Sequence, residues 1–137
     1  MKTFALIALT LLAAVARANA AQPDELAQNL FPPDQVLKYQ EEIGLDDSQS
    51  KALKELVEQA QSQFVGLQWD LQGEAGKLAR LLRSPRVDET AALAQVDRVL
   101  SQEGQVKKAQ LTLLIRIKNL LTPEQQQKLS TLRDNSP

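Results

Sequence analysis

The sequence predicts an all-α fold, an elongated antiparallel hairpin of four helices, two long and two short. Three observations predict it. Apolar residues recur at alternating spacings of four and three over two long segments, which is the pattern of a packed helix pair. Turn-forming residues stand mainly between these segments, and no alternating strand pattern appears. A short loop joins the long segments, so they should pack antiparallel.

Residues 1–20 have the features of a secretory signal peptide. Lys2 precedes an apolar run from Phe4 to Val15, and Ala18-Asn19-Ala20 is a small-x-small cleavage site. The run is too short to span a bilayer. The alternative is an N-terminal anchor helix that is not cleaved. Arg17 argues against it, because this residue interrupts the apolar run. We therefore expect a soluble periplasmic protein with no stable membrane insertion after cleavage.

The composition of the remaining chain excludes several classes of protein. It has no Cys and no His, and the one Met is the initiator. Without Lys2 and Arg17 the 16 basic residues fall to 14, against 17 acidic residues, which gives a formal charge of −3. A nucleic-acid binder would usually be clearly basic. No disulfide can stabilise the domain.

The first short helix should follow a flexible N-terminal tail at residues 21–29, which is rich in Pro, Asp and Gln. Pro32 and Pro33 favour the start of this helix, and Gly44 is well placed to end it. Its expected apolar residues are Val36, Leu37, Tyr39 and Ile43.

The second helix should begin after Asp46 and run to about Arg83. Within its apolar stripe only Glu74 is charged. The structural interpretation is a partly exposed carboxylate paired with Lys77 one turn on, and the functional alternative is a buried polar site. The stripe consists of Leu53, Val57, Ala60, Phe64, Leu67, Leu71, Leu78 and Leu81.

The third helix should begin after Asp88 and run to about Leu120. Its two apolar stripes differ in phase, which predicts a bend or a change of packing partner near Gly104. With the loop centred on Pro85 and Arg86, the basic Arg116 of this helix would fall opposite Glu55. The stripes are Leu93, Val96 and Leu100, then Val106, Leu113, Leu114, Ile117 and Leu120.

Two similar five-residue boxes begin the second and fourth helices. They read Leu45-Asp46-Asp47-Ser48-Gln49 and Leu121-Thr122-Pro123-Glu124-Gln125. In each, Asp46 or Thr122 can accept a backbone N–H, and Gln49 or Gln125 can reach back to close a capping box. The fourth helix should fray near Asp134, leaving residues 134–137 disordered.

These boxes, behind a secretory signal, resemble the LTxxQ motif of a family of bacterial periplasmic proteins. The family includes the chaperone-like Spy and CpxP, the zinc-resistance protein ZraP and the metal sensor CnrX. The downstream box matches fully, and the upstream box has Asp46 in place of Thr. Leu30 to Gln35 is also similar to the first-helix entry of the heavy-metal-sensor branch. The resemblance implies one helical-hairpin domain at residues 30–133 and, with the thin architecture, a homodimer.

A second face of the second helix is a candidate interaction surface. Val65, Trp69, Gly73 and Gly76 point away from the main stripe, and glycines inside a helix cost about 1 kcal/mol each relative to alanine. One interpretation is a homodimer or client-binding surface anchored by Trp69, with Leu67 nearby. The alternative is that the first or fourth helix covers Trp69 within one chain.

The hairpin tip is basic, with four cations and no acid among them: Lys77, Arg80, Arg83 and Arg86. We favour solvated helix-end chemistry for them, because cations interact well with a helix C-terminus. The alternative is a docking patch for an acidic partner.

Enzyme chemistry and cofactor binding find no support in the residues. The chain has no His base, no Cys nucleophile, no Gly-rich phosphate loop and no recognisable Ser elbow. We therefore expect no enzyme and no cofactor. Transition-metal sites need imidazole, thiolate or thioether ligands, so the His ligands of CnrX-like sensors have no counterpart and no metal site is predicted.

The resemblance implies a periplasmic ATP-independent chaperone or envelope-stress accessory protein that binds unfolded clients on a helical surface. One alternative is a regulatory sensor of the heavy-metal-resistance type, acting by contact with a membrane-bound signalling partner. A metal-binding resistance protein is a further alternative.

Overall fold

The computed structural model describes residues 25, 26 and 28–137. The chain divides into two units with the boundary between Phe31 and Pro32, and the described residues of each are taken separately. In the first unit Asn29 donates from its side-chain Nδ2 to the Glu25 carbonyl at 3.2 Å. The predicted signal peptide lies outside the described residues, as does most of the predicted tail.

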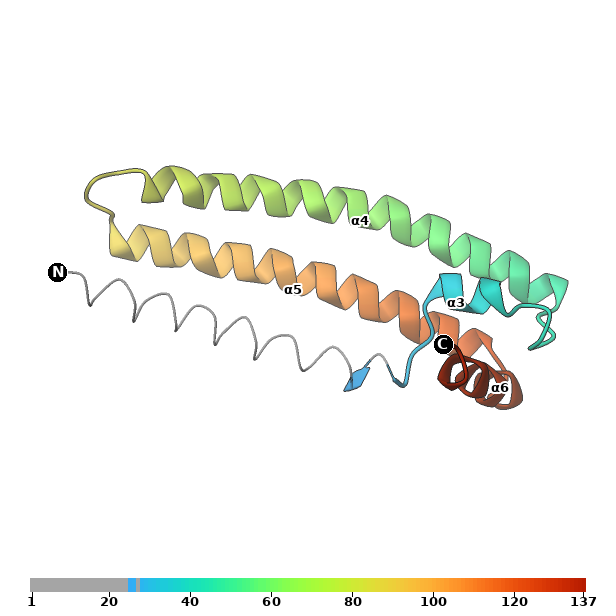
Figure 1. Ribbon diagram of the computed structural model, residues 1–137. Helices are drawn as coiled ribbons and strands as arrows, with labels where there is room; N and C mark the ends of the chain where they lie inside the picture. Colours follow the sequence, from blue (N-terminus) through green and yellow to red (C-terminus); the bar gives the residue numbers. More distant parts are fainter. Residues whose placement is uncertain (1–24, 27) are drawn as a thin grey trace, which may run out of the picture. The chain divides into compact units, whose positions relative to one another are not determined.

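The second unit is a helical hairpin with two short helices at one end (Figure 1). In chain order it contains α3 (Pro33–Lys38), α4 (Asp47–Leu82), α5 (Glu89–Leu120) and α6 (Pro123–Asp134). The long helices α4 and α5 pack against each other, while α3 and α6 lie at the end away from the α4–α5 loop. Residues 28–137 contain no strand. The predicted four-helix hairpin is confirmed.

Side chains cap the three longer helices at the residues that the sequence indicated. Asp46 accepts the Gln49 backbone N–H at 2.7 Å, and Thr122 accepts the Gln125 backbone N–H at 3.1 Å. Each Gln side chain in turn accepts the backbone N–H of its own capping residue, at 3.1 and 3.0 Å. Both predicted capping boxes are therefore confirmed. Asp88 caps α5 through the Ala91 N–H at 3.1 Å.

The two capping glutamines also bind each other, which the sequence did not reveal. Nε2 of Gln49 donates to Oε1 of Gln125 at 2.7 Å, and Nε2 of Gln125 donates to Oε1 of Gln49 at 2.9 Å. The second hydrogen of each amide goes to the carbonyl just before the other box, Leu120 for Gln49 and Gly44 for Gln125, both at 3.1 Å. Both amides are thereby saturated. We call this arrangement the amide pair.

The interface between α4 and α5 follows one continuous stripe on α5. Its most buried members are Ala92, Gln95, Ala109 and Ile117. The sequence predicted a bend or a change of packing partner near Gly104, and α5 runs unbroken through that residue. Gln95 and Gln102 lie in the stripe, although the sequence pattern was defined by apolar residues alone. Leaving them out shifted the helical phase that the pattern predicted for the buried face of α5. Leu93 and Leu100, expected in the stripe, are instead 55% and 56% exposed.

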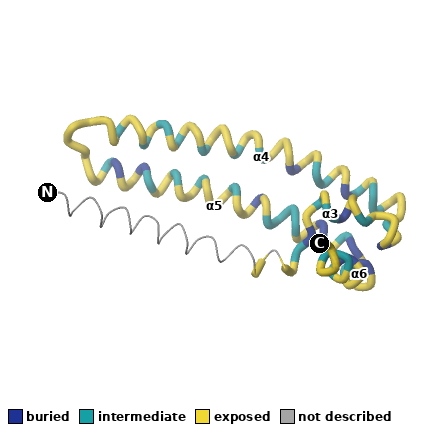
Figure 2. The backbone as a smooth tube through the Cα atoms, viewed as in Figure 1, coloured by how far each residue is buried: buried dark blue, intermediate teal, exposed yellow. Residues whose placement is uncertain are grey.

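Burial is concentrated at one end of the hairpin (Figure 2). We call this the closed end; it comprises α3, α6 and the adjoining ends of α4 and α5. Residues 61–108 form the arm, where a single helix pair has only one seam in which to bury side chains. Among described arm residues only Ala92 and Gln95 are buried. The buried residues of the closed end include Val36, Ile43, Leu53, Ala60, Ala109, Ile117, Leu121, Gln125 and Leu129.

Removing either member of the amide pair should destabilise the hairpin. We expect Gln49→Ala and Gln125→Ala each to lower the free energy of unfolding by about 2–3 kcal/mol, because each change removes four hydrogen bonds, the reciprocal amide bonds among them in a partly buried setting. The double variant should cost less than the two single losses combined, by about 1 kcal/mol or more, because the two reciprocal amide bonds are lost in either single variant. Urea unfolding measures these values.

Gln127→Ala is the matched control, since this exposed residue lies outside both boxes. It should change stability by less than about 0.5 kcal/mol. Additive losses in the double variant would show that the amide pair does not couple the two boxes.

Candidate functional site

The arm is held in register by a polar contact between α4 and α5. Gln95, 6% exposed, donates from Nε2 to both the backbone carbonyl of Glu74 at 2.9 Å and its side-chain Oε2 at 2.6 Å. The other carboxylate oxygen of Glu74 pairs with Lys77 at 2.9 Å. The side chain of Glu74 is 19% exposed, so the structural interpretation of this residue is confirmed, with Gln95 as an additional partner.

The outer face of α4 exposes an aromatic and a β-branched side chain. Trp69 is 70% exposed and Val65 57%, so the interpretation in which another helix covers Trp69 within one chain is wrong. Both line a shallow hollow together with Gln68 and Gln72. Leu67 does not share this face. It lies two positions before Trp69, and two steps along an α-helix turn the side-chain direction by about 200°. Leu67 is also only partly exposed.

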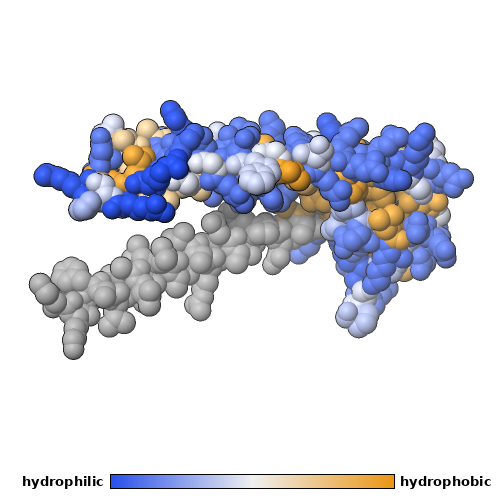
Figure 3. All heavy atoms as spheres, turned by 90° about the horizontal axis from the view of Figure 1, so that it is seen from above, coloured by the Kyte–Doolittle hydropathy of each residue, from blue (hydrophilic) through white to orange (hydrophobic). Residues whose placement is uncertain are grey.

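The glycines of this face have open space around them. A Cβ built on Gly73 or Gly76 would meet no atom within 4 Å, and the same holds at Gly66. Their small size is therefore not required by packing within the chain. The view onto α4 in Figure 3 shows pale and hydrophobic spheres interrupting an otherwise hydrophilic surface along the arm.

The outer face of α5 carries a second set of exposed apolar residues. Leu93 and Leu100 lie seven residues apart on one face, and Ile115 continues it with an exposure of 49%. Sequence reasoning missed this face because it assigned both leucines to the buried stripe. Counting Gln95 and Gln102 as stripe members would have revealed the correct phase.

The basic tip is only partly neutralised. Lys77 pairs with Glu74, whereas Arg80, Arg83 and Arg86 are exposed and make no ion pair with any described residue. Exposed apolar side chains of Leu82 and Val87 adjoin them. The tip thus exposes both apolar and cationic groups.

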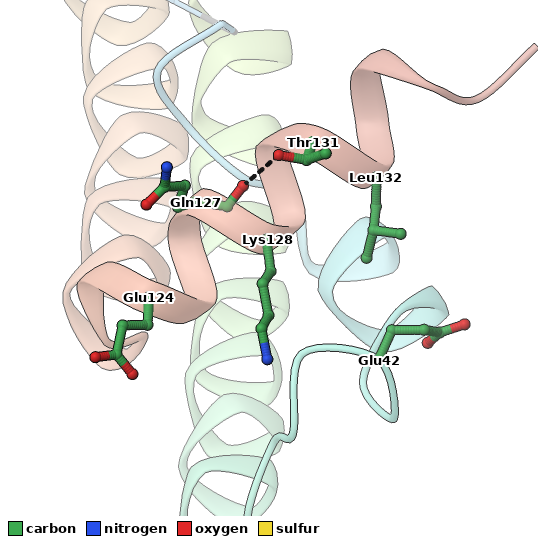
Figure 4. Close-up of a pocket in the computed structure, with 6 residues that line it drawn as sticks. All are labelled: Glu42, Glu124, Gln127, Lys128, Thr131 and Leu132. Carbon is green, nitrogen blue, oxygen red and sulfur yellow. Dashed lines mark hydrogen bonds between the residues drawn. The ribbon is translucent and has the colours of Figure 1, made fainter.

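A further hollow lies at the closed end, between α6 and the turn that follows α3. In Figure 4, Lys128 and Leu132 extend from α6 toward the turn that carries Glu42. Near this hollow the Tyr39 hydroxyl lies 2.5 Å from the Ser136 hydroxyl, so Ser136, within the segment predicted to be disordered, is placed against the end of α3. The hollow is lined by Glu42, Glu124, Gln127, Lys128, Thr131 and Leu132.

A third hollow lies between α4 and α5. Glu55 and Arg116 both line it, as the predicted antiparallel register required, although neither forms an ion pair in the described part of the chain.

Within the described part of the chain, no group of three His, Cys, Asp or Glu residues is arranged to hold a metal ion. Among the same residues, none of the helices combines the length and the apolar character that crossing a membrane requires.

Comparison with known proteins identifies a family. A family model described as LTXXQ motif family protein matches residues 34–133. The match covers more than half of the 137 residues and includes both capping boxes. No curated protein and no solved structure matches the chain.

The Glu74 contact should make the stability of the arm depend on pH. Hydrogen bonds from Lys77 and Gln95 hold the pKa of the Glu74 carboxyl below its ordinary value of 4.5. A carboxyl with a lowered folded-state pKa stabilises the fold above its unfolded pKa, and this contribution disappears as the pH falls through the folded value. The Glu74→Gln variant should therefore melt below the unmodified protein at neutral pH.

That difference in melting temperature should shrink as the pH is lowered below 4.5. Melting curves followed by circular dichroism at several pH values test this. Glu103→Gln, at an exposed position on α5, provides the control and should show no comparable pH-dependent difference. A Glu74→Gln deficit that stays constant down to acid pH would contradict the assignment.

Proposed function

The chain belongs to the LTXXQ motif family, and from that premise we propose that it is a periplasmic ATP-independent chaperone. In this proposal it binds unfolded or partly folded polypeptides on the outer face of α5. The observation that carries the proposal is the exposure of Leu93 and Leu100, at 55% and 56%, on the arm. The fold leaves about half of each side chain exposed, so they are available to apolar segments of another chain.

The strength of each contact suits reversible binding. Full burial of a leucine side chain contributes about 1.5–3 kcal/mol, and these leucines have roughly half of that area still to bury. A client segment that covers both would therefore be held weakly and released without an energy source. The family resemblance to Spy and CpxP supports this type of activity.

The surroundings of the leucines also support transient capture. Asp97 and Lys107 lie on the same side of α5, and both are exposed, as is Gly104 between them. Isolated apolar residues within a polar helix face can contact client segments of many different sequences, because they do not require the client to adopt one particular conformation. With 32 residues, α5 is about 48 Å long, so an extended client can contact several such positions.

Replacing the two leucines should weaken client protection without unfolding the protein. We expect Leu93→Gln/Leu100→Gln to suppress aggregation of a chemically denatured model client several-fold less well than the unmodified protein. Light scattering at matched chaperone-to-client ratios measures this effect. The free energy of unfolding should change by less than about 0.5 kcal/mol, since both side chains are already exposed.

Leu37→Gln is the matched control, because Leu37 is 47% exposed but lies on α3 outside the arm; it should leave aggregation suppression unchanged. If the unmodified protein fails to suppress aggregation at stoichiometric concentration, the chaperone proposal is wrong. Stable complex formation with a membrane-bound signalling protein, in the absence of such suppression, would favour the regulatory alternative.

A further inference from the structure

The basic tip, at the α4–α5 loop end of the hairpin, has cations that the fold does not use. Residues 75–87 include four cations and no acid. Three of these cations, Arg80, Arg83 and Arg86, are exposed and form no ion pair with any described residue. A guanidinium group is planar and weakly hydrated, and it can bind two oxygen atoms of a phosphate or carboxylate at once. The basic tip is therefore able to bind an anionic surface.

Exposed apolar side chains lie among these cations. Leu82 is 56% exposed and Val87 39%, and in the sequence they flank Arg83 and Arg86. Figure 3 shows long hydrophilic side chains projecting at the loop end of the hairpin, with hydrophobic spheres among them. A surface that binds this end must therefore accept cations and apolar carbon atoms side by side.

The loop that carries these residues is ordered by its own hydrogen bonds. The Arg83 backbone N–H donates to the carbonyls of Ala79 and Arg80, at 3.2 and 3.3 Å, and so closes the last turn of α4. The Ser84 hydroxyl donates to the Arg86 carbonyl at 2.9 Å. Because the backbone is already held in one conformation, binding through the tip costs little further ordering.

The acidic residues that adjoin the tip in sequence are few, and two of them are engaged. Glu74 pairs with Lys77 at 2.9 Å. Asp88 accepts the Ala91 backbone N–H as the cap of α5. Glu89 is exposed in the first turn of the same helix, where the partial positive charge of the helix N-terminus attracts it. These acids leave the three arginines without a partner.

The opposite end of the hairpin differs in charge. The closed end, residues 34–60 and 109–134, carries nine acidic and seven basic residues, so an anionic surface attracts the tip and not the closed end. We infer that the basic tip docks reversibly on an anionic lipid surface. In this arrangement Arg80, Arg83 and Arg86 lie at the lipid phosphates. The apolar side chains next to them enter the boundary between headgroups and acyl chains.

The mixture of side chains favours a lipid surface over an acidic polypeptide. Carboxylates alone would pair with the arginines and would leave Leu82 and Val87 in water. A bilayer presents phosphates directly above apolar carbon atoms, so it accommodates both kinds of side chain together. Each basic residue held near an anionic membrane surface strengthens binding about fivefold. A few such residues suit a contact that forms and breaks readily.

Docking at the tip would hold the proposed client surface close to the membrane. Leu93 and Leu100 lie 6 and 13 positions after Val87, which places both within about 20 Å of the tip along α5. The docking inference does not rest on client binding. Each can fail without the other, since vesicle binding reports the first and suppression of aggregation the second.

Vesicle binding tests the inference. The protein is purified after export, and its mass must show that residues 1–20 are absent, because that apolar run would itself bind lipid. By co-sedimentation, vesicles of equal parts phosphatidylglycerol and phosphatidylcholine should bind it at least about tenfold more strongly than phosphatidylcholine alone. Added salt should weaken this binding. Equal binding to both vesicles, or none to the anionic ones, would overturn the inference.

Removal of the three arginines should abolish most of the binding. Arg80→Gln/Arg83→Gln/Arg86→Gln should lower the partition coefficient on anionic vesicles by more than about tenfold. Circular dichroism should show that the variant keeps its helices, since all three side chains are exposed. A folded variant that still binds as the unmodified protein does would exclude the tip as the docking site.

A second triple variant is the matched control, because it removes the same charge from the closed end. Lys51→Gln/Arg116→Gln/Lys128→Gln changes three exposed cations that lie farther than a screening length from a surface docked at the tip. It should therefore change the partition coefficient less than about twofold. An equal loss in both triple variants would reduce the effect to net charge and would contradict docking by the tip.

The apolar side chains distinguish a lipid surface from an acidic polypeptide. Leu82→Gln/Val87→Gln keeps every charge and should lower the partition coefficient on anionic vesicles about fivefold or more. Leu37→Gln, at an exposed position on α3, is its control and should leave the coefficient unchanged. Vesicle binding that Leu82→Gln/Val87→Gln leaves unchanged would overturn the inference. Tight binding of polyglutamate in that case would identify an acidic polypeptide as the partner.

Discussion

The reciprocal hydrogen bonds between the side-chain amides of Gln49 and Gln125 are the constraint on which the rest of the structure depends. They join the start of α4 to the start of α6, and their remaining hydrogens bind the carbonyls of Leu120 and Gly44. One small group of atoms therefore fixes the end of α5 and the turn after α3 as well. Glutamate would cap a helix equally well, but it has no N–H to donate to the other box.

This closure at one end determines where apolar residues are buried. Around the amide pair, four helix segments meet and enclose residues such as Leu53, Ile117 and Leu129. Beyond it, α4 and α5 continue as a pair with a single seam, so apolar residues outside the seam remain exposed. The arm thus offers two faces with different chemistry: one presents separated leucines, and the other carries small and aromatic residues.

Local chemistry in the sequence was sufficient to predict the four helices and the limits of the three longer ones. Proline, glycine and capping residues act over a few positions. The first short helix was expected to end at Gly44, and this was wrong: α3 ends at Lys38, and Gly44, with a positive φ of 68°, closes the turn that follows. The partners of polar side chains could not be predicted in the same way. Gln95 and Gln102 appear in the sequence as solvated residues, and only the packed helix pair places them in the seam. Leu93 and Leu100 were misassigned for that reason, whereas the exposed Trp69 face was identified from its helical spacing.

The amide pair also has a consequence for the order in which the chain folds. Residues near the α4–α5 loop are close in sequence, so their contacts form at small cost in loop entropy, whereas Gln49 and Gln125 are 76 positions apart. Folding should therefore start at the loop and proceed along the hairpin, with closure by the amide pair as its last step. A nascent arm would then present its interaction faces before the domain is complete.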